Sequence, residues 1–377
     1  MPAIEKEIRD LEGYVLPHEG EKHLATIVLL PFRKDTWREE ARPALSCFEK
    51  VIDAIRPFER VVLVIHPSFP VSLVTRFQKE NVTILRLPYD DSWARDNTPI
   101  FLRKEEKLVG VDFGFNSWGG DYDGLYPDYQ DDNLLGRRIL LELRIPRHPR
   151  KDFILEGGNI LSDGEGTILT SGECQLSKGR NPSLSQEEIE SVLKEELNAK
   201  KVLFLPYGIF EDETDGHVDN IASFLDPGVV ALATTEDKDD PQYERSREDL
   251  LYLQKETDAL GRPLKIVSLP LPKPQYLTKE ESLGLEKNQG VVERAEGRRL
   301  AASYCNFYQG KDFLLLPQFG AEEDKIAKQI LEDYYQGRKK IIPIESREIL
   351  LGGGNIHCIT KEIPFSPLYP IEPEETK

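Results

Sequence analysis

The sequence contains few cysteines, a single methionine and no long apolar run. Its 4 cysteines among 377 residues show neither a C-x-x-C spacing nor a zinc-finger pattern. No stretch approaches the roughly 20 apolar residues that a membrane helix needs. The N-terminus is charged, reading MPAIEKEIRDLEGYV, and has no apolar signal core. We therefore predict a cytoplasmic protein with reduced thiols and no membrane association.

Basic residues are outnumbered by acidic ones, which excludes a broad class of partners. The chain has 49 Lys and Arg against 67 Asp and Glu, a formal net charge of −18. Nucleic-acid binding relies on clusters of Lys and Arg that contact phosphates, so we predict no nucleic-acid partner. An acidic protein can attract a cationic ligand, although solubility alone also explains the charge. The 6 histidines are too scattered for a metal cluster, so we expect no metal.

Short apolar runs alternate with helical patterns along the whole chain. The runs are rich in Val, Ile and Leu and mostly end in Pro or Gly, as buried strands do where they meet loops. The helical segments have an apolar face or open with a capping residue. This alternation predicts an α/β protein. The predicted strands span 25–32, 60–67, 81–88, 107–115, 201–208, 228–235, 264–272, 312–320 and 340–346, and the predicted helices span 42–56, 183–199, 241–260 and 321–337.

Two observations favour one domain built of repeated units. The sequence has no Ser/Gly linker, and strand ends such as LPF, LPY and LPQ recur along it. The segment LEGGNILS (155–162) also echoes LGGGNIHC (351–358), so that Ser162 stands where Cys358 stands. We predict internal repeats in a single domain over 1–377, with 363–377 as an extended Pro-rich tail. Ser162 should be structurally ordinary and Cys358 the reactive member of the pair.

The stretch ETDGHVDNIASF, residues 213–224, holds an H-x-D pair made of His217 and Asp219. In an extended strand, residues two apart point to the same side, so these two can line one pocket. A histidine can transfer protons near neutral pH, and a carboxylate beside it can bind a cation. A turn followed by a partly exposed strand is the structural alternative.

The stretch YDDSWARDNTPIF, residues 89–101, places Trp93 and Asp96 downstream of Asp90 and Asp91. Acidic residues together with a tryptophan, the side chain with the best cation–π face, can form a cation site. The alternative is a turn before the strand PIFLR, with Trp93 as an ordinary core residue.

Glu156 and Cys358 are the remaining candidates for chemistry. Glu156 lies between the apolar run FIL and two glycines, so we expect it to be partly buried and to need a partner such as a histidine; a turn role is the alternative. Cys358 follows three glycines, which let a backbone come close to a ligand. A free cysteine is more often a small buried hydrophobe, and nucleophilic use requires the thiolate.

Taken jointly, these residues supply a cysteine nucleophile, a histidine acid/base, a glutamate to orient it and aspartates for a cation. A guanidinium is planar, carries five N–H donors and stays protonated at ordinary pH. Two carboxylates can hold it bidentately and fix its central carbon, which a thiolate can then attack. The set therefore favours hydrolysis of a guanidinium.

The motifs, in their order, resemble the agmatine deiminase family of the guanidine-modifying superfamily. The resemblance covers nearly the whole chain and rests on LPHEG, KDTWR, WARDNTPIF, DFGFNSWGG, LEGGNI, TDGHVDN, DDPQYERSRE, LAASYCNFY, PQFG and ILLGGGNIHCIT. It implies a pseudo-fivefold α/β propeller (pentein) of ββαβ modules around a central channel. It also implies a homo-oligomer, dimer or larger, and no metal or organic cofactor.

The resemblance assigns the catalytic roles residue by residue. Cys358 matches the nucleophile that forms a covalent thiouronium intermediate, and His217 matches the general acid/base. Glu156 matches the carboxylate that orients this histidine. Asp96 and Asp219 match the pair that holds the guanidinium.

The substrate-binding roles that the resemblance implies are less specific. Trp93 matches an aromatic residue of the substrate channel, and Gly352 leaves room for the bound carbon. Asp90 or Asp91 is the candidate for the distal ammonium. A site for free arginine would need a basic residue for the α-carboxylate, and the motifs offer only Arg95, which we expect in an internal ion pair.

The implied reaction is hydrolysis of agmatine to N-carbamoylputrescine and ammonia, in polyamine (putrescine) biosynthesis. Alternatives on the same fold are a bacterial-type peptidylarginine deiminase, a free arginine deiminase and an amidinotransferase. A non-catalytic polyamine-binding protein is an alternative of another class. The chain departs from close relatives at Asp215, at Lys361 and Glu362, and in the loop 283–296. No catalytic group is lost, but the departures leave the substrate open between agmatine and peptidyl-arginine, because peptidylarginine deiminases of bacterial type share the same core.

Overall fold

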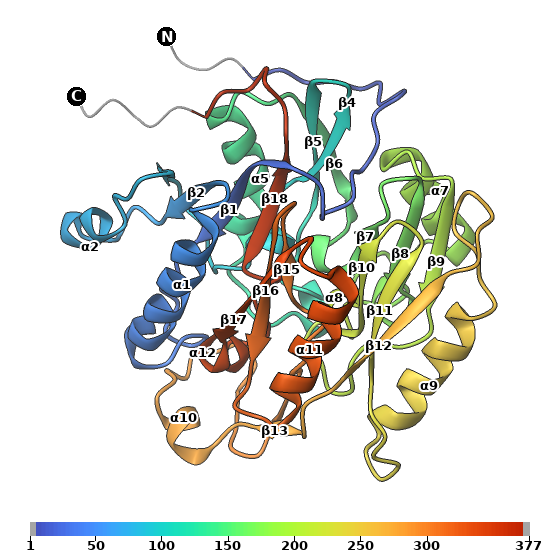
Figure 1. Ribbon diagram of the computed structural model, residues 1–377. Helices are drawn as coiled ribbons and strands as arrows, with labels where there is room; N and C mark the ends of the chain where they lie inside the picture. Colours follow the sequence, from blue (N-terminus) through green and yellow to red (C-terminus); the bar gives the residue numbers. More distant parts are fainter. Residues whose placement is uncertain (1–4, 372–377) are drawn as a thin grey trace.

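The computed structural model describes residues 5–371, and within them five sheets share one connectivity (Figure 1). In each, a first strand pairs antiparallel with a second, a helix follows, and a third strand pairs parallel with the second. We call each such ββαβ group a module. Modules 1 to 3 are β4 (Ile100–Lys104), β5 (Lys107–Gly114), α5 (Gln130–Glu142) and β6 (Arg147–Ile154); β7 (Leu161–Ser162), β8 (Thr167–Ser171), α7 (Gln186–Glu196) and β9 (Lys201–Leu205); and β10 (Ala222–Asp226), β11 (Val229–Thr234), α9 (Gln242–Leu253) and β12 (Lys265–Pro270).

Module 5 is built from two distant parts of the chain. Its first strand, β18, pairs antiparallel with β1, so that Val28 lies opposite Thr360, and β1 pairs parallel with β2. Figure 1 shows the red β18 beside the blue β1. Modules 4 and 5 are β15 (Tyr308–Gln309), β16 (Phe313–Gln318), α11 (Glu323–Tyr335) and β17 (Lys340–Glu345); and β18 (Thr360–Pro364), β1 (His23–Leu29), α1 (Arg42–Ile55), β2 (Arg60–Ile65) and an additional β3 (Val82–Arg86).

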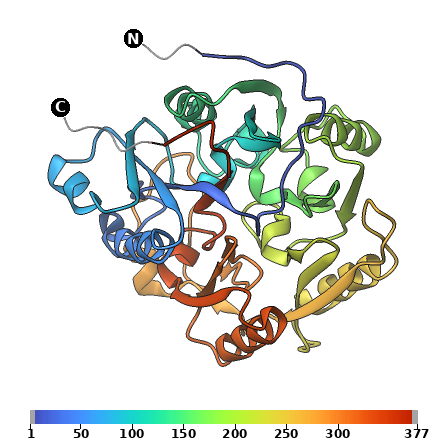
Figure 2. The ribbon, with the colours of Figure 1, turned by 45° about the horizontal axis from the view of Figure 1, so that its top comes forward.

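The modules follow one another around a common middle in chain order, as Figure 2 shows by its succession of colours. Short elements connect them. These are η1 (Glu39–Ala41), α2 (Val71–Arg76), α3 (Ala94–Asn97), α4 (Gly120–Asp123), η2 (Gly157–Asn159), α6 (Gly172–Gln175), α8 (Val218–Ile221), β13 (Gln275–Tyr276), α10 (Lys279–Leu283), β14 (Arg299–Leu300) and α12 (Arg347–Leu351).

Each strand and helix predicted from an apolar pattern contains an element of the predicted type, but several elements carry weak patterns. β6 reads RHPRKDFI and β8 reads TILTS, so charged or small polar residues interrupt the apolar signal. Helix α5 contains Gly136 in its middle, which lowers helix propensity. A side chain at this glycine would meet the Asp112 carboxylate at 2.4 Å. The glycine therefore lets α5 pack closely on its sheet.

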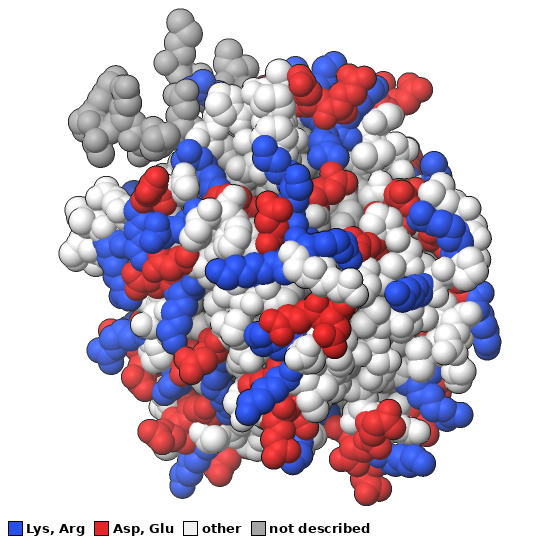
Figure 3. Space-filling view, viewed as in Figure 1, with Lys and Arg blue, Asp and Glu red and all other residues white. Residues whose placement is uncertain are grey.

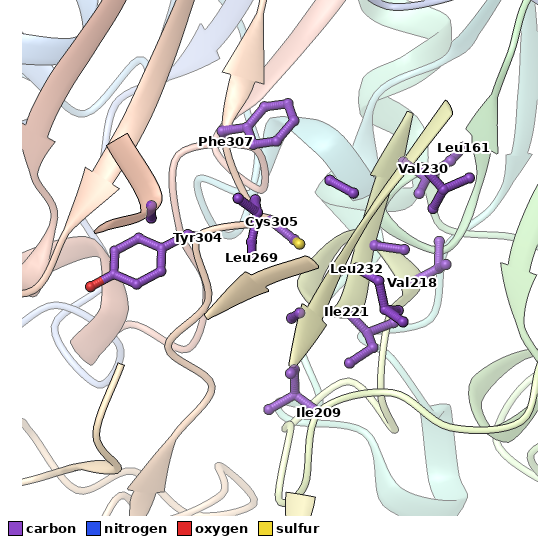
Figure 4. Close-up of a cluster of buried hydrophobic side chains, with 14 of the residues drawn as sticks. Leu161, Ile209, Val218, Ile221, Val230, Leu232, Leu269, Tyr304, Cys305 and Phe307 are labelled. Atoms are coloured by element: carbon purple, nitrogen blue, oxygen red, sulfur yellow. The ribbon is translucent and has the colours of Figure 1, made fainter. Parts of the chain in front are cut away.

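Apolar side chains fill the space between neighbouring modules. Figure 4 shows such a cluster, in which Leu232 of β11 and Leu269 of β12 lie near Cys305 and Phe307 of module 4. Burial of this kind contributes on the order of 25 cal/mol per Å² of apolar surface. It fixes the positions of the loops between modules, which carry the polar residues discussed below. Charged side chains of both signs are interspersed over the outer face shown in Figure 3.

The predicted tail begins inside a strand, because β18 runs through Pro364. After it, the Phe365 N–H donates to the Lys22 carbonyl at 3.1 Å, and the Ser366 hydroxyl donates to the Glu106 carbonyl. Residues 372–377 of that tail lie outside the described residues. Over residues 5–371, no helix is both long and apolar enough to cross a membrane.

Candidate active site

A short turn precedes the first strand of each module and carries the polar residues of the middle. Asn159, Asn220 and Asn306 stand two residues before β7, β10 and β15, and Cys358 stands two residues before β18. Asn97 ends the corresponding turn before β4. Cys358 therefore takes the place that an asparagine has in the other modules.

This topology corrects the equivalence expected from the L-x-G-G-N-I echo. The residue equivalent to Cys358 is Asn159, three positions before Ser162, because LEGGN runs directly into β7 whereas LGGGN is followed by a further turn. Ser162 lies in β7 itself, where its hydroxyl donates to the Leu16 carbonyl at 2.8 Å. Ser162 is structurally ordinary, as expected, but its match with Cys358 is wrong.

The backbone of Gly158 marks the point where three predicted site residues converge. A side chain on Gly158 would meet Nδ1 of His217 at 2.5 Å, Oδ1 of Asp96 at 2.8 Å and Oδ2 of Asp219 at 3.1 Å. The Gly158 N–H donates to Oδ1 of Asp96 at 2.8 Å. The second glycine of LEGGN is therefore required for the three groups to share one space.

A pocket of about 330 Å³ opens beside this point. Cys358 and His217 lie in its wall together with Asp96 and Trp93, so the structure brings these predicted residues together. Asp219 lies just behind the wall, with Oδ2 3.7 Å from Sγ of Cys358. The lining residues are Trp93, Asp96, Trp118, Leu125, Glu213, Thr214, His217, Asn220, Gly352, Gly353, Gly354 and Cys358.

The Cys358 thiol is 6% exposed and lies among acidic groups. Burial, followed by the charges of Asp219 and Asp96, raises the pKa of Cys358 well above its ordinary value. Nδ2 of Asn306 donates to the sulfur at 3.2 Å and opposes this shift. The empty pocket therefore holds a protonated thiol, and a cation between the carboxylates would favour the thiolate.

His217 lies near Asp96 and near the buried ion pair of Glu156 with Arg180. Its Nδ1 is 3.8 Å from Oδ2 of Asp96. Burial alone lowers the pKa of His217, but the Asp96 charge, the Cys174 thiol and the Glu156 charge raise it well above its ordinary value. His217 is thus an imidazolium that can donate a proton.

The extended H-x-D strand predicted for His217 and Asp219 is wrong. His217 caps the one-turn helix α8, and Asp219 lies within that turn. Both side chains still reach the same space, because successive residues of one tight turn fan out over a small arc. The alternation of side chains in a strand thus predicted correctly that His217 and Asp219 are neighbours, although neither residue lies in a strand.

Glu156 lies close to His217 without an assigned hydrogen bond to it. Acceptor atoms of Glu156, Cys174 and His217 lie within 4.8 Å of one another. Oε1 of Glu156 accepts from Nε of Arg180 at 3.0 Å, and both side chains are fully buried. Among the described residues, Oε2 of Glu156 has no hydrogen-bond partner. The carboxylate therefore faces the histidine with one free oxygen.

The two aspartates are held differently. Oδ1 of Asp96 accepts from the Gly158 N–H, and Oδ2 accepts from Nε1 of Trp118 at 2.9 Å. Oδ2 of Asp219 accepts from Nδ1 of His357 at 2.8 Å. Oδ1 of Asp219 has no partner within the described part of the chain. The capacity of this oxygen to accept a hydrogen bond is therefore unused by the described residues.

Trp93 and Gly352 both line the pocket. Nε1 of Trp93 donates to Oδ2 of Asp91 at 3.0 Å, and its ring stacks on Trp37 at 5.2 Å. A side chain at Gly352 would collide with that Trp37 ring at 2.7 Å. The glycine nearest the sulfur is Gly354, where a side chain would lie 2.9 Å from Sγ of Cys358.

Asp90 does not reach the pocket. Its Oδ2 accepts from the backbone N–H groups of Asp131 at 2.8 Å and Asp132 at 3.1 Å, at the start of α5. The further carboxylate in the pocket wall is Glu213, whose Oε1 accepts from Nε of Arg294 at 3.0 Å. Glu213 thus lies in the pocket wall, where Asp90 does not, and both of its oxygens accept from Arg294.

Sequence reasoning gave no role to several other residues of the site. Trp118 and Asn306 lie in the motifs DFGFNSWGG and LAASYCNFY, but neither motif shows by itself that it reaches the thiol. His357 stands directly before Cys358, and a histidine beside a cysteine was a usable signal. Arg180 lies in an ordinary loop, SKGRNP, where no pattern points to Glu156.

Several known proteins are similar to this chain over most of its length. The family model described as Porphyromonas-type peptidyl-arginine deiminase matches residues 15–364. An agmatine deiminase predicted in Listeria monocytogenes is 45% identical over 354 residues, which cover 94% of this chain and 97% of that protein. The solved agmatine deiminase of Enterococcus faecalis has a TM-score of 0.91 and 36% identity, and the match covers 95% of this chain and 99% of that one.

A third comparison involves a substrate complex. The substrate-bound agmatine deiminase of C. jejuni, a cysteine-to-serine variant, has a TM-score of 0.81 and 26% identity, with 96% of this chain and 99% of that one covered. These likenesses extend over nearly the full length of both partners. The chain belongs to the Porphyromonas-type peptidyl-arginine deiminase family, in which its relatives include the agmatine deiminases.

Proposed function

We propose that the protein is an agmatine deiminase, which hydrolyses agmatine to N-carbamoylputrescine and ammonia. The observation that carries the proposal is the convergence of the Cys358 thiol, the His217 imidazolium and the Asp96 and Asp219 carboxylates on one pocket. The names of the Listeria and Enterococcus relatives support the choice of substrate.

The pocket suits one guanidinium group. The Asp96 and Asp219 carboxylates both approach the space beside Gly158, with Oδ1 of Asp96 2.8 Å and Oδ2 of Asp219 3.1 Å from the position of a side chain there. A planar cation held between two carboxylates is fixed in orientation, since each charge-assisted N–H bond has a defined direction. Its central carbon would then face Sγ of Cys358.

The same cation activates the nucleophile. Asp96 and Asp219 are the charges that raise the pKa of the Cys358 thiol after burial itself. A guanidinium between them offsets both charges, so the thiol loses its proton to solvent when the substrate binds. The thiolate is therefore produced where its target already lies.

The reaction then proceeds through two attacks on one carbon. Sγ of Cys358 forms a bond to the guanidinium carbon, and His217 gives its proton to the nitrogen that leaves as ammonia. A covalent thiouronium group remains on the sulfur. The neutral His217, faced by Glu156, takes a proton from water, whose oxygen bonds to the carbon. The C–S bond then breaks and the remaining hydroxyl proton passes to solvent, which releases the ureido product and restores the thiolate.

The pocket wall favours agmatine over arginine. Within the described structure, its lining contains no Lys or Arg that could bind an α-carboxylate. Arg95 is not available for this role, because its Nη1 donates to Oε2 of Glu362 at 2.8 Å. Arg95 is thus in an internal ion pair, as expected, with Glu362 at 2.8 Å and Glu19 at 3.8 Å.

An assay of ammonia release with agmatine, free arginine and an arginine peptide tests the substrate. We expect agmatine to be turned over with a kcat/KM at least about 100-fold above that of the other two substrates. Binding of free arginine or of the peptide would leave a polar group of the substrate without a partner in the pocket. An inert agmatine and a processed peptide would contradict the proposal. Adding an acceptor amine and finding the amidino group on it would instead indicate an amidinotransferase.

Alkylation of Cys358 should depend strongly on pH and on the charge of the reagent. Because the thiol pKa is raised, the thiolate fraction near pH 7 lies below the few per cent of an ordinary cysteine. Neutral iodoacetamide should react slowly at that pH and faster as the pH rises. Cationic chloroacetamidine should react faster than iodoacetamide at every pH. Mass spectrometry of the Cys358 peptide measures both rates, and a plateau of iodoacetamide labelling below pH 8 would oppose this.

Replacing Glu213 by glutamine should weaken agmatine binding. Loss of the carboxylate removes the partner for the distal ammonium, so KM for agmatine should rise about tenfold with little change in kcat. Asp90→Asn is the matched variant. It should leave KM unchanged and cost about 1 kcal/mol of stability, because Asp90 caps α5. A raised KM in Asp90→Asn together with an unchanged KM in Glu213→Gln would instead assign the distal ammonium to Asp90.

We also infer that the modules form a closed pseudo-fivefold α/β propeller within a single domain. The shared connectivity of their sheets and their succession in Figure 2 support this. The 4 cysteines are free, which fits a reducing compartment. A place in polyamine biosynthesis follows from the proposed product. A homo-oligomer stays a prediction that light scattering can check.

A further inference from the structure

The imidazole of His357 lies between two carboxylates. Its Nδ1 is 2.8 Å from Oδ2 of Asp219, and its Nε2 is 2.8 Å from Oε2 of Glu19. The ring is 2% exposed. His357 precedes Cys358 in the chain, whereas Glu19 comes from the loop before β1. The ring thus links the two parts of the chain that build module 5 to Asp219 of module 3.

Both ring nitrogens of His357 act as donors. An ionised carboxylate offers only acceptors, so each of these short contacts requires an N–H on the ring. The ring is then an imidazolium with one proton on each nitrogen. Burial and the Arg95 charge lower the pKa of His357, but the Glu19 charge and the hydrogen bonds to Asp219 and Glu19 raise it overall.

The outer carboxylate of this arrangement is itself held. Oε1 of Glu19 accepts from the Gln309 N–H at 3.3 Å and lies 3.8 Å from Nη2 of Arg95. The Arg95 backbone N–H donates to the Cys358 carbonyl at 3.0 Å, and its Nε donates to the His357 carbonyl at 3.3 Å. Glu19 and Arg95 therefore fix the His357 ring from behind and the backbone of Cys358 at the same time.

The consequence for Asp219 is an unequal use of its two oxygens. His357 occupies Oδ2, while Oδ1 is buried and unpartnered among the described residues. Without the His357 donor, the carboxylate could rotate and turn either oxygen toward other donors, such as the Cys358 thiol 3.7 Å away. A carboxylate in a closed space keeps one orientation only when a neighbour fixes it.

We propose that His357, braced by Glu19, is a positioning residue that fixes the Asp219 carboxylate through its Oδ2 and so holds it in one orientation toward the guanidinium. This inference rests on the proposed function for the identity of the ligand. His357 does not touch the substrate, and it acts through Asp219.

Two substitutions separate the two ends of the ring. In His357→Asn the amide nitrogen falls near the position of Nδ1 and keeps a donor for Asp219. In His357→Gln the amide nitrogen falls near Nε2 and keeps a contact with Glu19 only. We expect kcat/KM of the Asn variant to stay within about 5-fold of wild type, and that of the Gln variant to fall about 100-fold. Rates are normalised to active sites titrated with chloroacetamidine.

Binding without turnover gives the second readout. In the Cys358→Ser background, calorimetry should show that His357→Gln raises the Kd for agmatine at least about tenfold, and that His357→Asn changes it little. A merely structural role would lower the folded fraction equally in both variants and leave Kd unchanged. Equal effects of the two substitutions, or no effect of either, would overturn the proposal. His148→Gln, at another buried histidine paired with a glutamate, is the matched control and should leave both values unchanged.

Glu19→Gln decides the question if the His357 variants do not fold. The amide can still contact Nε2 but cannot hold the imidazolium charge, so Kd for agmatine should rise about 3-fold or more. An unchanged Kd would overturn the proposal. If wild type binds agmatine without hydrolysing it, the proposed function fails, whereas the ranking of the Kd values still tests the role of His357.

Discussion

Cys358→Ser is expected to abolish turnover, with kcat/KM reduced by at least about 10⁴-fold and an unchanged midpoint of thermal unfolding. Serine keeps the shape of the side chain, so Asn306 and the Gly354 backbone remain in contact with it. Its hydroxyl, however, is a far weaker nucleophile than a thiolate and keeps its proton at ordinary pH. Ammonia release and a melting curve measure the two effects.

The control for this substitution is a cysteine outside the pocket. Cys47 lies on α1, and its thiol donates to the Glu345 carbonyl at 3.1 Å. Burial raises the pKa of Cys47 to about 12, so it is unreactive near neutral pH. Cys47→Ala should keep full activity. Appreciable turnover in Cys358→Ser, or its loss in Cys47→Ala, would remove Cys358 from the role of nucleophile.

Asp219→Asn is expected to reduce kcat/KM about 10³-fold. The donor at Nδ1 of His357 selects the amide oxygen for the position of Oδ2. The amide nitrogen must then occupy the position of Oδ1, and the side chain no longer carries the negative charge that would attract the substrate. A charge-assisted attraction is thus lost. Steady-state kinetics with agmatine measure the loss, which should appear in both kcat and KM.

The same substitution should change the thiol in the opposite direction. Asp219 is the first charge, after burial, that raises the pKa of Cys358. Its removal lowers that pKa, so neutral iodoacetamide should label Cys358 faster at about pH 7 while turnover falls. Asp226→Asn, at a surface pair with Arg338, should alter neither rate. Slower labelling together with slower turnover would indicate general damage to the pocket and not a loss of charge.

The sequence was informative where chemistry follows from residue type. Cysteine, histidine and paired aspartates indicate nucleophilic attack on a cation, and the turns that hold Cys358, His217, Asp96 and Asp219 do meet at one pocket. Strands β1, β2 and β16 were equally legible because nearly all of their residues are buried, and most are apolar. β6 and β8 were not, since their burial depends on neighbours that only the folded chain supplies.

Other features depend on distances through space that no local pattern encodes. Asp90 precedes Trp93 in the chain, yet the start of α5 captures its carboxylate, and Glu213 of another module reaches the pocket instead. The L-x-G-G-N-I echo shows a second limit. The two segments share letters because both need glycines next to crowded side chains, not because they hold equivalent positions. Only strand pairing reveals that Asn159 corresponds to Cys358.

Because β1 pairs with β18, module 5 can be completed only after the C-terminal part of the chain has been synthesised. Modules 1 to 4 follow one another in the chain and can pack as each leaves the ribosome. Strand β1 is synthesised before modules 1 to 4, but its partner β18 is synthesised after them. Cys358 is synthesised just before β18. A nascent chain that ends before Cys358 can therefore contain modules 1 to 4 but lacks the pocket thiol. We expect ribosome-bound chains that stop before Cys358 to be folded in part and chemically silent, so reactivity begins only with the last module.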